Sequence, residues 1–94
     1  MKGHGAIRFS RHAVEKLDDP TSKQLRITAE RIAVVLQRPE CIDNSDSPML
    51  MAVGRLTGTL SLCVVDKFVA GDIRVITFFP AHRGRYESKI LPGR

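Results

Sequence analysis

The alternation of apolar and polar residues divides the chain into a helix-rich first half and a strand-rich second half. Residues 6–9 alternate between the two kinds and predict a short first strand. From residue 49 onward the period changes to two, which predicts strands over residues 49–54, 59–67 and 72–79. The short segments between these strands have the length of hairpin turns, so we expect a three-stranded antiparallel meander.

A first helix is predicted directly after the first strand. Ser10 is a suitable N-cap, and Phe9 and Val14 have the spacing of a hydrophobic staple. The helix should end before Pro20, because the residue that precedes a proline is disfavoured in the helical region. Residues 21–26 are polar and either extend this helix or form a loop.

The second predicted helix has the clearest boundaries. Thr28 caps it, Ile27 and Ile32 repeat the staple spacing, and Arg38-Pro39 ends it. One side of this helix is apolar and broad enough to pack on a sheet, formed by Ala29, Ile32, Ala33, Val35 and Leu36. The order of strand, two helices and three strands predicts an α+β fold, with the helices packed on one face of a mainly antiparallel sheet.

Composition is that of an ordinary globular protein. The chain has 94 residues, of which 43% are hydrophobic and 27% charged, and this suits a single domain over residues 1–94. The longest uncharged stretch, residues 56–65, is far shorter than the roughly 18 apolar residues of a membrane span, and the N-terminus has no apolar signal core. We therefore expect a soluble, cytoplasmic protein. Cys41 and Cys63 are too isolated for a zinc or redox motif and should be reduced and buried.

Charge is distributed unevenly along the chain. The net charge is +5, with basic residues concentrated near both ends and an acidic segment between them that holds Glu40, Asp43 and Asp46. This balance favours an anionic partner such as RNA, DNA or an acidic protein. The acidic segment is either a face that repels nucleic acid or a solvated turn. No motif for a metal ion, a phosphate-binding loop or a nucleophile elbow is present, and no cofactor is expected.

Two basic clusters are candidates for one site. The segment His82-Arg83-Gly84-Arg85-Tyr86 follows the most apolar predicted strand, and His12 lies in Phe9-Ser10-Arg11-His12-Ala13 at the start of the first helix. Cationic and proton-transfer groups at the rim of a sheet suit an anionic polymer. We expect the two clusters to converge at one end of the sheet.

The element order and the basic cluster with a tyrosine beyond the last core strand resemble the RelE/ParE-type toxin superfamily, within the wider set of barnase-like and colicin-like ribonuclease toxins. Short motifs resemble a group of uncharacterised small domains placed among those toxins: Phe9-Ser10-Arg11-His12-Ala13, Ile27-Thr28-Ala29-Glu30-Arg31-Ile32, Arg38-Pro39-Glu40 and Arg74-Val75-Ile76-Thr77-Phe78-Phe79-Pro80. The resemblance implies a RelE-like fold, metal-independent cleavage of RNA, with or without the ribosome, and an acidic antitoxin as partner.

The resemblance carries over to single residues only in part. Arg83 and Tyr86 match the basic and phenolic members of the RelE-type set. His12 departs from that set, since typical RelE-like enzymes have no such leading histidine, and it fits the barnase-like or uncharacterised relatives better. The departure leaves open which residue is the base.

Cleavage of RNA without metal requires a base for the 2′-hydroxyl, an acid for the departing 5′-oxygen and a cation for the charge on phosphorus. His12 is the candidate base, because the first turn of a helix and the neighbouring Arg8 and Arg11 favour its neutral form. His82 or Tyr86 would be the acid. Candidates for holding phosphate or RNA are Arg8, Arg11, Arg83, Arg85 and Lys89.

Each of these assignments has a structural alternative. His12 could be an ordinary surface histidine, and Arg83-Gly84-Arg85 a solvated loop with the Tyr86 ring packed on the sheet edge. Arg74 and Lys67 alternate with core positions and are expected to face solvent, whereas Met49 and Met51 should pack. Two other functions remain open: a module that binds nucleic acid or a partner without catalysis, and a toxin that acts on a protein such as a topoisomerase.

Overall fold

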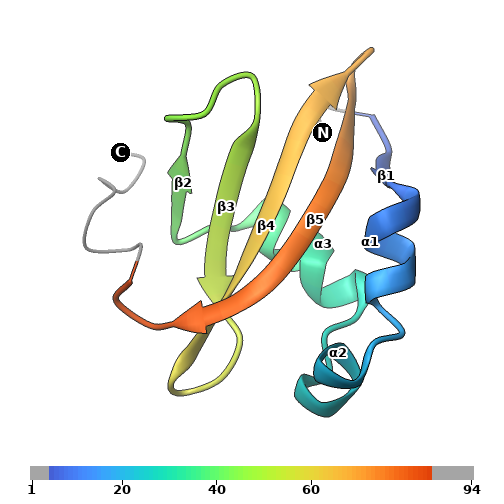
Figure 1. Cartoon of the computed structure of the whole chain (residues 1–94). Coiled ribbons are helices and arrows are strands. Elements are labelled where there is room, and N and C mark those ends of the chain that lie inside the picture. The colour runs from blue at the N-terminus through green and yellow to red at the C-terminus, as the bar shows by residue number, and fades with distance from the viewer. Residues whose placement is uncertain (1–4, 86–94) are drawn as a thin grey trace.

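The computed structural model describes residues 5–85 and shows an α+β fold in which three helices pack against a five-stranded mixed sheet (Figure 1). The strand order is β1-β5-β4-β3-β2. Strands β2 to β5 form an antiparallel meander, and β1 pairs with β5 in parallel. The strands are β1 (Ile7–Phe9), β2 (Cys41–Asp43), β3 (Leu50–Arg55), β4 (Leu60–Val69) and β5 (Asp72–His82), and the helices are α1 (Arg11–Lys16), α2 (Pro20–Leu25) and α3 (Ala29–Gln37).

The expectation of a three-stranded meander is wrong, because a fourth antiparallel strand lies in the segment read as an acidic turn. Strand β2 pairs with β3, with Cys41 opposite Val53 and Asp43 opposite Met51. A strand of three residues contains too little alternation to be recognised in the sequence. It forms because β3 offers it an open edge to pair with.

The number of helices also differs from the prediction of two. The polar segment left open in the sequence becomes α2, where the Asp19 carboxylate accepts a hydrogen bond of 2.8 Å from the Ser22 backbone N–H. Helix α1 ends at Lys16, before Pro20 as predicted, and Pro20 occupies the first turn of α2, where its missing N–H has no cost. Arg26 ends α2 in the left-handed conformation, with φ of 58°.

The two predicted N-caps are confirmed. The Ser10 hydroxyl accepts a hydrogen bond of 3.1 Å from the Ala13 backbone N–H, and Thr28 accepts one of 3.2 Å from Arg31. None of the helices within residues 5–85 is long and apolar enough to cross a membrane.

The main hydrophobic core lies between the helices and one face of the sheet. Val35 of α3 packs directly on Gly54 of β3, where a Cβ atom would lie only 2.9 Å from a Val35 methyl group. Phe78 is the largest fully buried side chain, and the Lys16 ammonium lies 5.5 Å from its ring centre. The buried members of this core are Ala13, Ile27, Ile32, Val35, Ala52, Leu56, Leu62, Val64, Val75 and Phe78.

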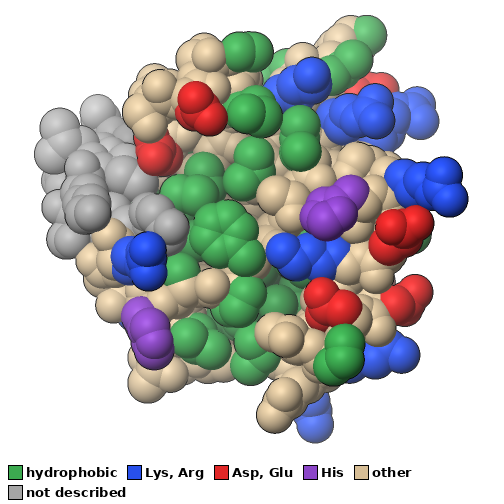
Figure 2. Space-filling model, viewed as in Figure 1, with side chains coloured by type: hydrophobic (Ala, Val, Ile, Leu, Met, Phe, Trp, Pro, Cys, Tyr) green, Lys and Arg blue, Asp and Glu red, His purple; other side chains and the backbone are tan. Residues whose placement is uncertain are grey.

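A second apolar cluster lies on the other face of the sheet, which we call the open face. Among the described residues this cluster contains no helical residue, and its side chains come from β2 to β5. The cluster consists of buried Cys41, Val53 and Cys63 with partly buried Met51, Phe79 and Ala81. Figure 2 views this face and shows hydrophobic side chains across its centre. Both cysteines are buried and not joined in a disulfide, as predicted.

Candidate nucleic-acid interface

Helix α1 is fastened along the edge of β5 at the point where the short β1 ends. The Ser10 backbone N–H donates to the Val75 carbonyl at 2.9 Å, and the Ser10 hydroxyl donates to the Ile76 carbonyl, also at 2.9 Å. These bonds give Ser10 a second role besides capping the helix. Two residues later, Nε2 of His12 lies 3.2 Å from Oγ1 of Thr77.

A β-bulge in β5 decides which side chains share the open face with His12. Thr77 pairs with Val65 and Val75 pairs with Asp66, so Ile76 has no partner in β4. In a regular strand Arg74 and Thr77, three positions apart, would point to opposite faces. The extra residue places both of them on the open face.

Three cations lie in register beside this position. Arg8 of β1 pairs with Arg74 of β5, which pairs with Lys67 of β4. We call these three residues the cationic row. Arg8 and Arg74 are exposed and Lys67 is half-buried, so the row crosses three adjacent strands on the open face. Figure 2 shows lysine and arginine side chains gathered beside the hydrophobic centre of this face.

Two members of the cationic row, Arg8 and Arg74, line a hollow of about 420 Å³. Its lining comes from β1, the end of β4, the turn that follows and β5: Arg8, Phe9, Val69, Ala70, Asp72 and Arg74. The carboxylate of Asp72 in this lining accepts hydrogen bonds from Nε of Arg8 at 2.8 Å and from the Ala6 backbone N–H at 2.9 Å, and so joins β1 to β5. These bonds lower the pKa of Asp72, which therefore stays ionised and offsets part of the charge of Arg8.

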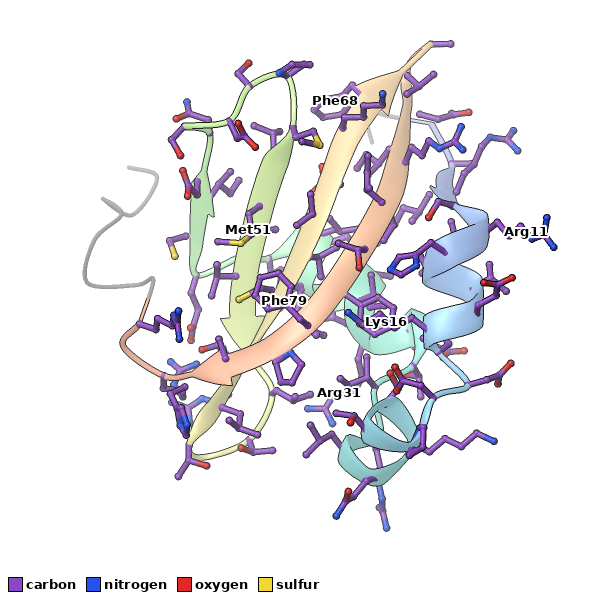
Figure 3. All side chains as sticks on the ribbon, in the orientation of Figure 1. Arg11, Lys16, Arg31, Met51, Phe68 and Phe79 are labelled. Atoms are coloured by element: carbon purple, nitrogen blue, oxygen red, sulfur yellow. The ribbon has the colours of Figure 1, made fainter. Side chains whose placement is uncertain are left out.

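Arg11 lies outside the row. Its Nε contacts Glu15 Oε2 at 3.3 Å on the exposed side of α1, and Figure 3 shows the side chain pointing away from the sheet. The ion pair is an ordinary i, i+4 contact on a helix surface.

Arg83, predicted to hold phosphate, is bound by a carboxylate. Its Nη2 lies 2.9 Å and 3.1 Å from the two oxygens of Glu40, and its Nη1 donates to the Ser61 hydroxyl at 3.0 Å. The Arg83 side chain is only 23% exposed. Its neighbours in sequence, His82 at the end of β5 and Arg85 in the following turn, are exposed. Tyr86 and Lys89 lie outside the described residues.

The two predicted clusters do not converge. His12 contacts Thr77, whereas His82 lies five residues further along β5, on the order of 15 Å away for an extended strand. Figure 2 shows the two described histidines well apart on the viewed surface. Arg83 lies further still, on the Glu40 side of the sheet. The structure therefore groups His12 with the cationic row instead of with Arg83.

Sequence reasoning missed Lys67, Arg74 and Thr77 as members of this group. The two cations were expected to face solvent. A signal for their pairing is present only in the observed turn, Ala70-Gly71, from which they lie at equal distances, because the predicted strand ends, residues 67 and 72, did not place them opposite each other. Thr77 offered no such signal, since its place on the open face depends on the bulge.

Within residues 5–85, no group of three or more histidine, cysteine, aspartate or glutamate side chains is arranged to hold a metal ion. Comparison of the chain with models of known protein families, with curated proteins and with solved structures finds no match.

Proposed function

We propose that this domain is a RelE-like ribonuclease of the toxin type, which binds RNA across the cationic row and uses His12 as the base in metal-independent cleavage. The observation that carries the proposal is the placement of an exposed imidazole beside three cations in register on one sheet face. The proposal moves the phosphate-binding role from Arg83 to Arg74 and Lys67.

The chemistry of the proposed site follows from the types of side chain. An imidazole accepts a proton near neutral pH, which suits removal of the 2′-hydroxyl proton. A guanidinium donates paired hydrogen bonds to phosphate oxygens, and an ammonium contributes a compact positive charge. Arg74 forms no ion pair with any of residues 5–85 and therefore suits phosphate better than Arg8, which binds Asp72.

Arg83 receives a structural role in this proposal. Its guanidinium already has two carboxylate oxygens and a hydroxyl as acceptors, all within 3.1 Å. Binding a phosphate would require it to give up these contacts, which hold the end of β5 against the residue before β2.

The test is incubation of purified protein with end-labelled single-stranded RNA in a chelator. We expect cleavage by the wild type, and loss of roughly 100-fold or more in rate for His12→Ala, since general base catalysis contributes about that much. His82→Ala is the matched control, because this exposed histidine lies on the order of 15 Å from the contact of His12 with Thr77, too far to act as the acid of the same site. Equal cleavage by wild type and His12→Ala would exclude the catalytic assignment.

Binding is tested separately from cleavage with the His12→Ala protein. Affinity for single-stranded RNA should fall steeply with salt, and Lys67→Ala and Arg74→Ala should each reduce the slope of log K against log salt by about 0.7. Arg38→Ala, an exposed cation at the C-terminal end of α3, is the control and should leave the slope unchanged. Identical slopes in all variants would place the RNA elsewhere.

A second candidate is a binding module for an acidic protein, and the β4–β5 hairpin favours it. Val69 is 41% exposed and lines the hollow beside Arg8 and Arg74, a pairing of apolar and basic surface that suits an acidic segment with an apolar anchor. In the toxin proposal this segment belongs to an antitoxin. Val69→Ser should weaken capture of such a protein and leave RNA cleavage unchanged.

A further inference from the structure

We infer that Thr77 is a positioning residue: it holds His12 in the tautomer with the proton on Nε2 and leaves Nδ1 as the atom that accepts a proton. The part that concerns the substrate rests on the proposed function. The part that concerns the tautomer rests on the geometry alone and is measured without RNA.

The fastening of α1 supports a fixed geometry for this contact. Ser10 makes two hydrogen bonds of 2.9 Å to consecutive carbonyls of β5, those of Val75 and Ile76. Ala13, one residue after His12, is fully buried against the core. His12 therefore lies between two anchored residues, and its backbone has little freedom relative to Thr77.

The bulge in β5 supplies the partner. Because Ile76 has no partner in β4, the Thr77 side chain points to the open face and reaches Nε2 of His12 at 3.2 Å. Without the extra residue this position would point into the core. The irregularity of the strand and the hydrogen bond to the imidazole are thus parts of one arrangement.

The Thr77 hydroxyl can accept from an Nε2–H or donate to an Nε2 lone pair, and the intrinsic preference of the neutral imidazole selects the first arrangement. A hydroxyl oxygen has two lone pairs and accepts readily from an N–H, and a neutral imidazole has one donor and one acceptor nitrogen. The Nε2–H form is also the intrinsically preferred tautomer of neutral histidine. When Nε2 donates to Thr77, the lone pair of Nδ1 is left for a proton, which is what a base requires.

The inference is tested by long-range ¹H–¹⁵N spectra of the imidazoles at about pH 8, where an ordinary histidine is neutral. We expect the His12 nitrogens in the wild type to show the pattern of a single Nε2–H tautomer. Thr77→Val should move them toward the averaged pattern of a solvent-exposed histidine, and Thr77→Ser should restore the wild-type pattern. The exposed His82 serves as an internal reference and should be unchanged in all three proteins.

Two results would overturn the inference: an Nδ1–H pattern for His12, or the same averaged pattern in wild type and Thr77→Val. Backbone amide spectra of the variants show whether each protein is folded, and Thr77→Ser keeps the test valid if the valine variant is not.

RNA cleavage gives the second readout. Thr77→Val should reduce kcat by about tenfold with KM nearly unchanged, as for loss of an orienting partner, and Thr77→Ser should recover most of it. A wild type that does not cleave RNA would refute the proposed function, whereas the spectra would still decide the tautomer. A wild type that cleaves RNA with no effect of Thr77→Val would refute the positioning role alone.

Discussion

The guanidinium of Arg83 is bound by the carboxylate of Glu40, with Nη2 2.9 Å and 3.1 Å from its two oxygens. Arg83 follows β5 and Glu40 precedes β2, so the pair joins two segments that are separated in the sheet by β4 and β3. The acidic segment was expected to repel nucleic acid or to be a solvated turn. Instead, its Glu40 is the partner of Arg83, the cation that was expected to bind nucleic acid.

Removal of this ion pair should lower stability. The side chains of Arg83 and Glu40 are 23% and 38% exposed, so each substitution to alanine should reduce the free energy of unfolding by about 1 kcal/mol. Urea denaturation of the single and double variants measures the coupling between them. We expect the double variant to lose less than the two single losses added together, and strict additivity would show that the pair contributes nothing. Arg38→Ala, at an exposed site, is the control.

Asp66 should make the protein less stable as the pH rises. Its side chain is 4% exposed in β4, and burial raises the pKa of the carboxyl group to about 6. Between about pH 4 and 6 the unfolded chain has lost the proton and the folded protein keeps it, so the free energy of unfolding falls over this range and is level above it. The loss attributable to Asp66 is about 2 to 3 kcal/mol.

The comparison with Asp66→Asn isolates this effect. The variant should match the wild type near pH 4 and be more stable above pH 6, as measured by thermal or urea unfolding. Asp19, Asp43 and Asp72 have lowered pKa values and contribute the opposite slope, because the stability they add is lost as the pH falls toward 4 and below. They are present in both proteins, so their contribution cancels. A difference that does not vary with pH would contradict the prediction.

The contact between Gly54 and Val35 should make substitutions at these sites interdependent. A Cβ at Gly54 would lie 2.9 Å and 3.4 Å from the two Val35 methyl carbons, so Gly54→Ala should reduce the free energy of unfolding by about 1 to 3 kcal/mol through overpacking. Val35→Ala should also destabilise, because it leaves a cavity. The double variant should be more stable than the sum predicts, since the new methyl group fills space that the valine vacated. The free energies of unfolding are measured by urea denaturation. A double variant that loses as much stability as the two single variants together, or more, would contradict this packing.

Cys41 and Cys63 should not form a disulfide with each other. Both pair with Val53, one on each side of β3, so their Cα atoms are two strand spacings apart, about 9.6 Å, beyond the roughly 7 Å that a disulfide spans. Mild oxidation of the folded protein should leave the monomer unchanged on a non-reducing gel. A thiol reagent should react slowly with the folded protein, because both residues are buried. In denaturant the reagent should modify both thiols rapidly. A new intramolecular species on oxidation would show that the strands do not have this register.

Local features of the sequence were sufficient for the elements that depend on neighbouring residues. Ser10 and Thr28 were identified as N-caps because the capping bond reaches only three residues ahead. The two long hairpin strands were recognised from alternation over many residues, and the α+β class followed from their order. Strand β2 was missed because its three residues gain their structure from β3, which the chain reaches only later.

Part of the candidate site could likewise be predicted from the sequence, and part could not. Its chemical components, an imidazole near one end and an excess of cations, are properties of the sequence, which also made an anionic partner the natural expectation. Which cations accompany His12 was decided by the tertiary structure, because the parallel pairing of β1 with β5 aligns Arg8 with Arg74, and the bulge at Ile76 turns Thr77 toward His12. The packing of the whole sheet decides which segments pair when they lie more than 60 residues apart. It also decides to which face an irregular strand turns its side chains. Local patterns in the sequence therefore cannot predict either feature.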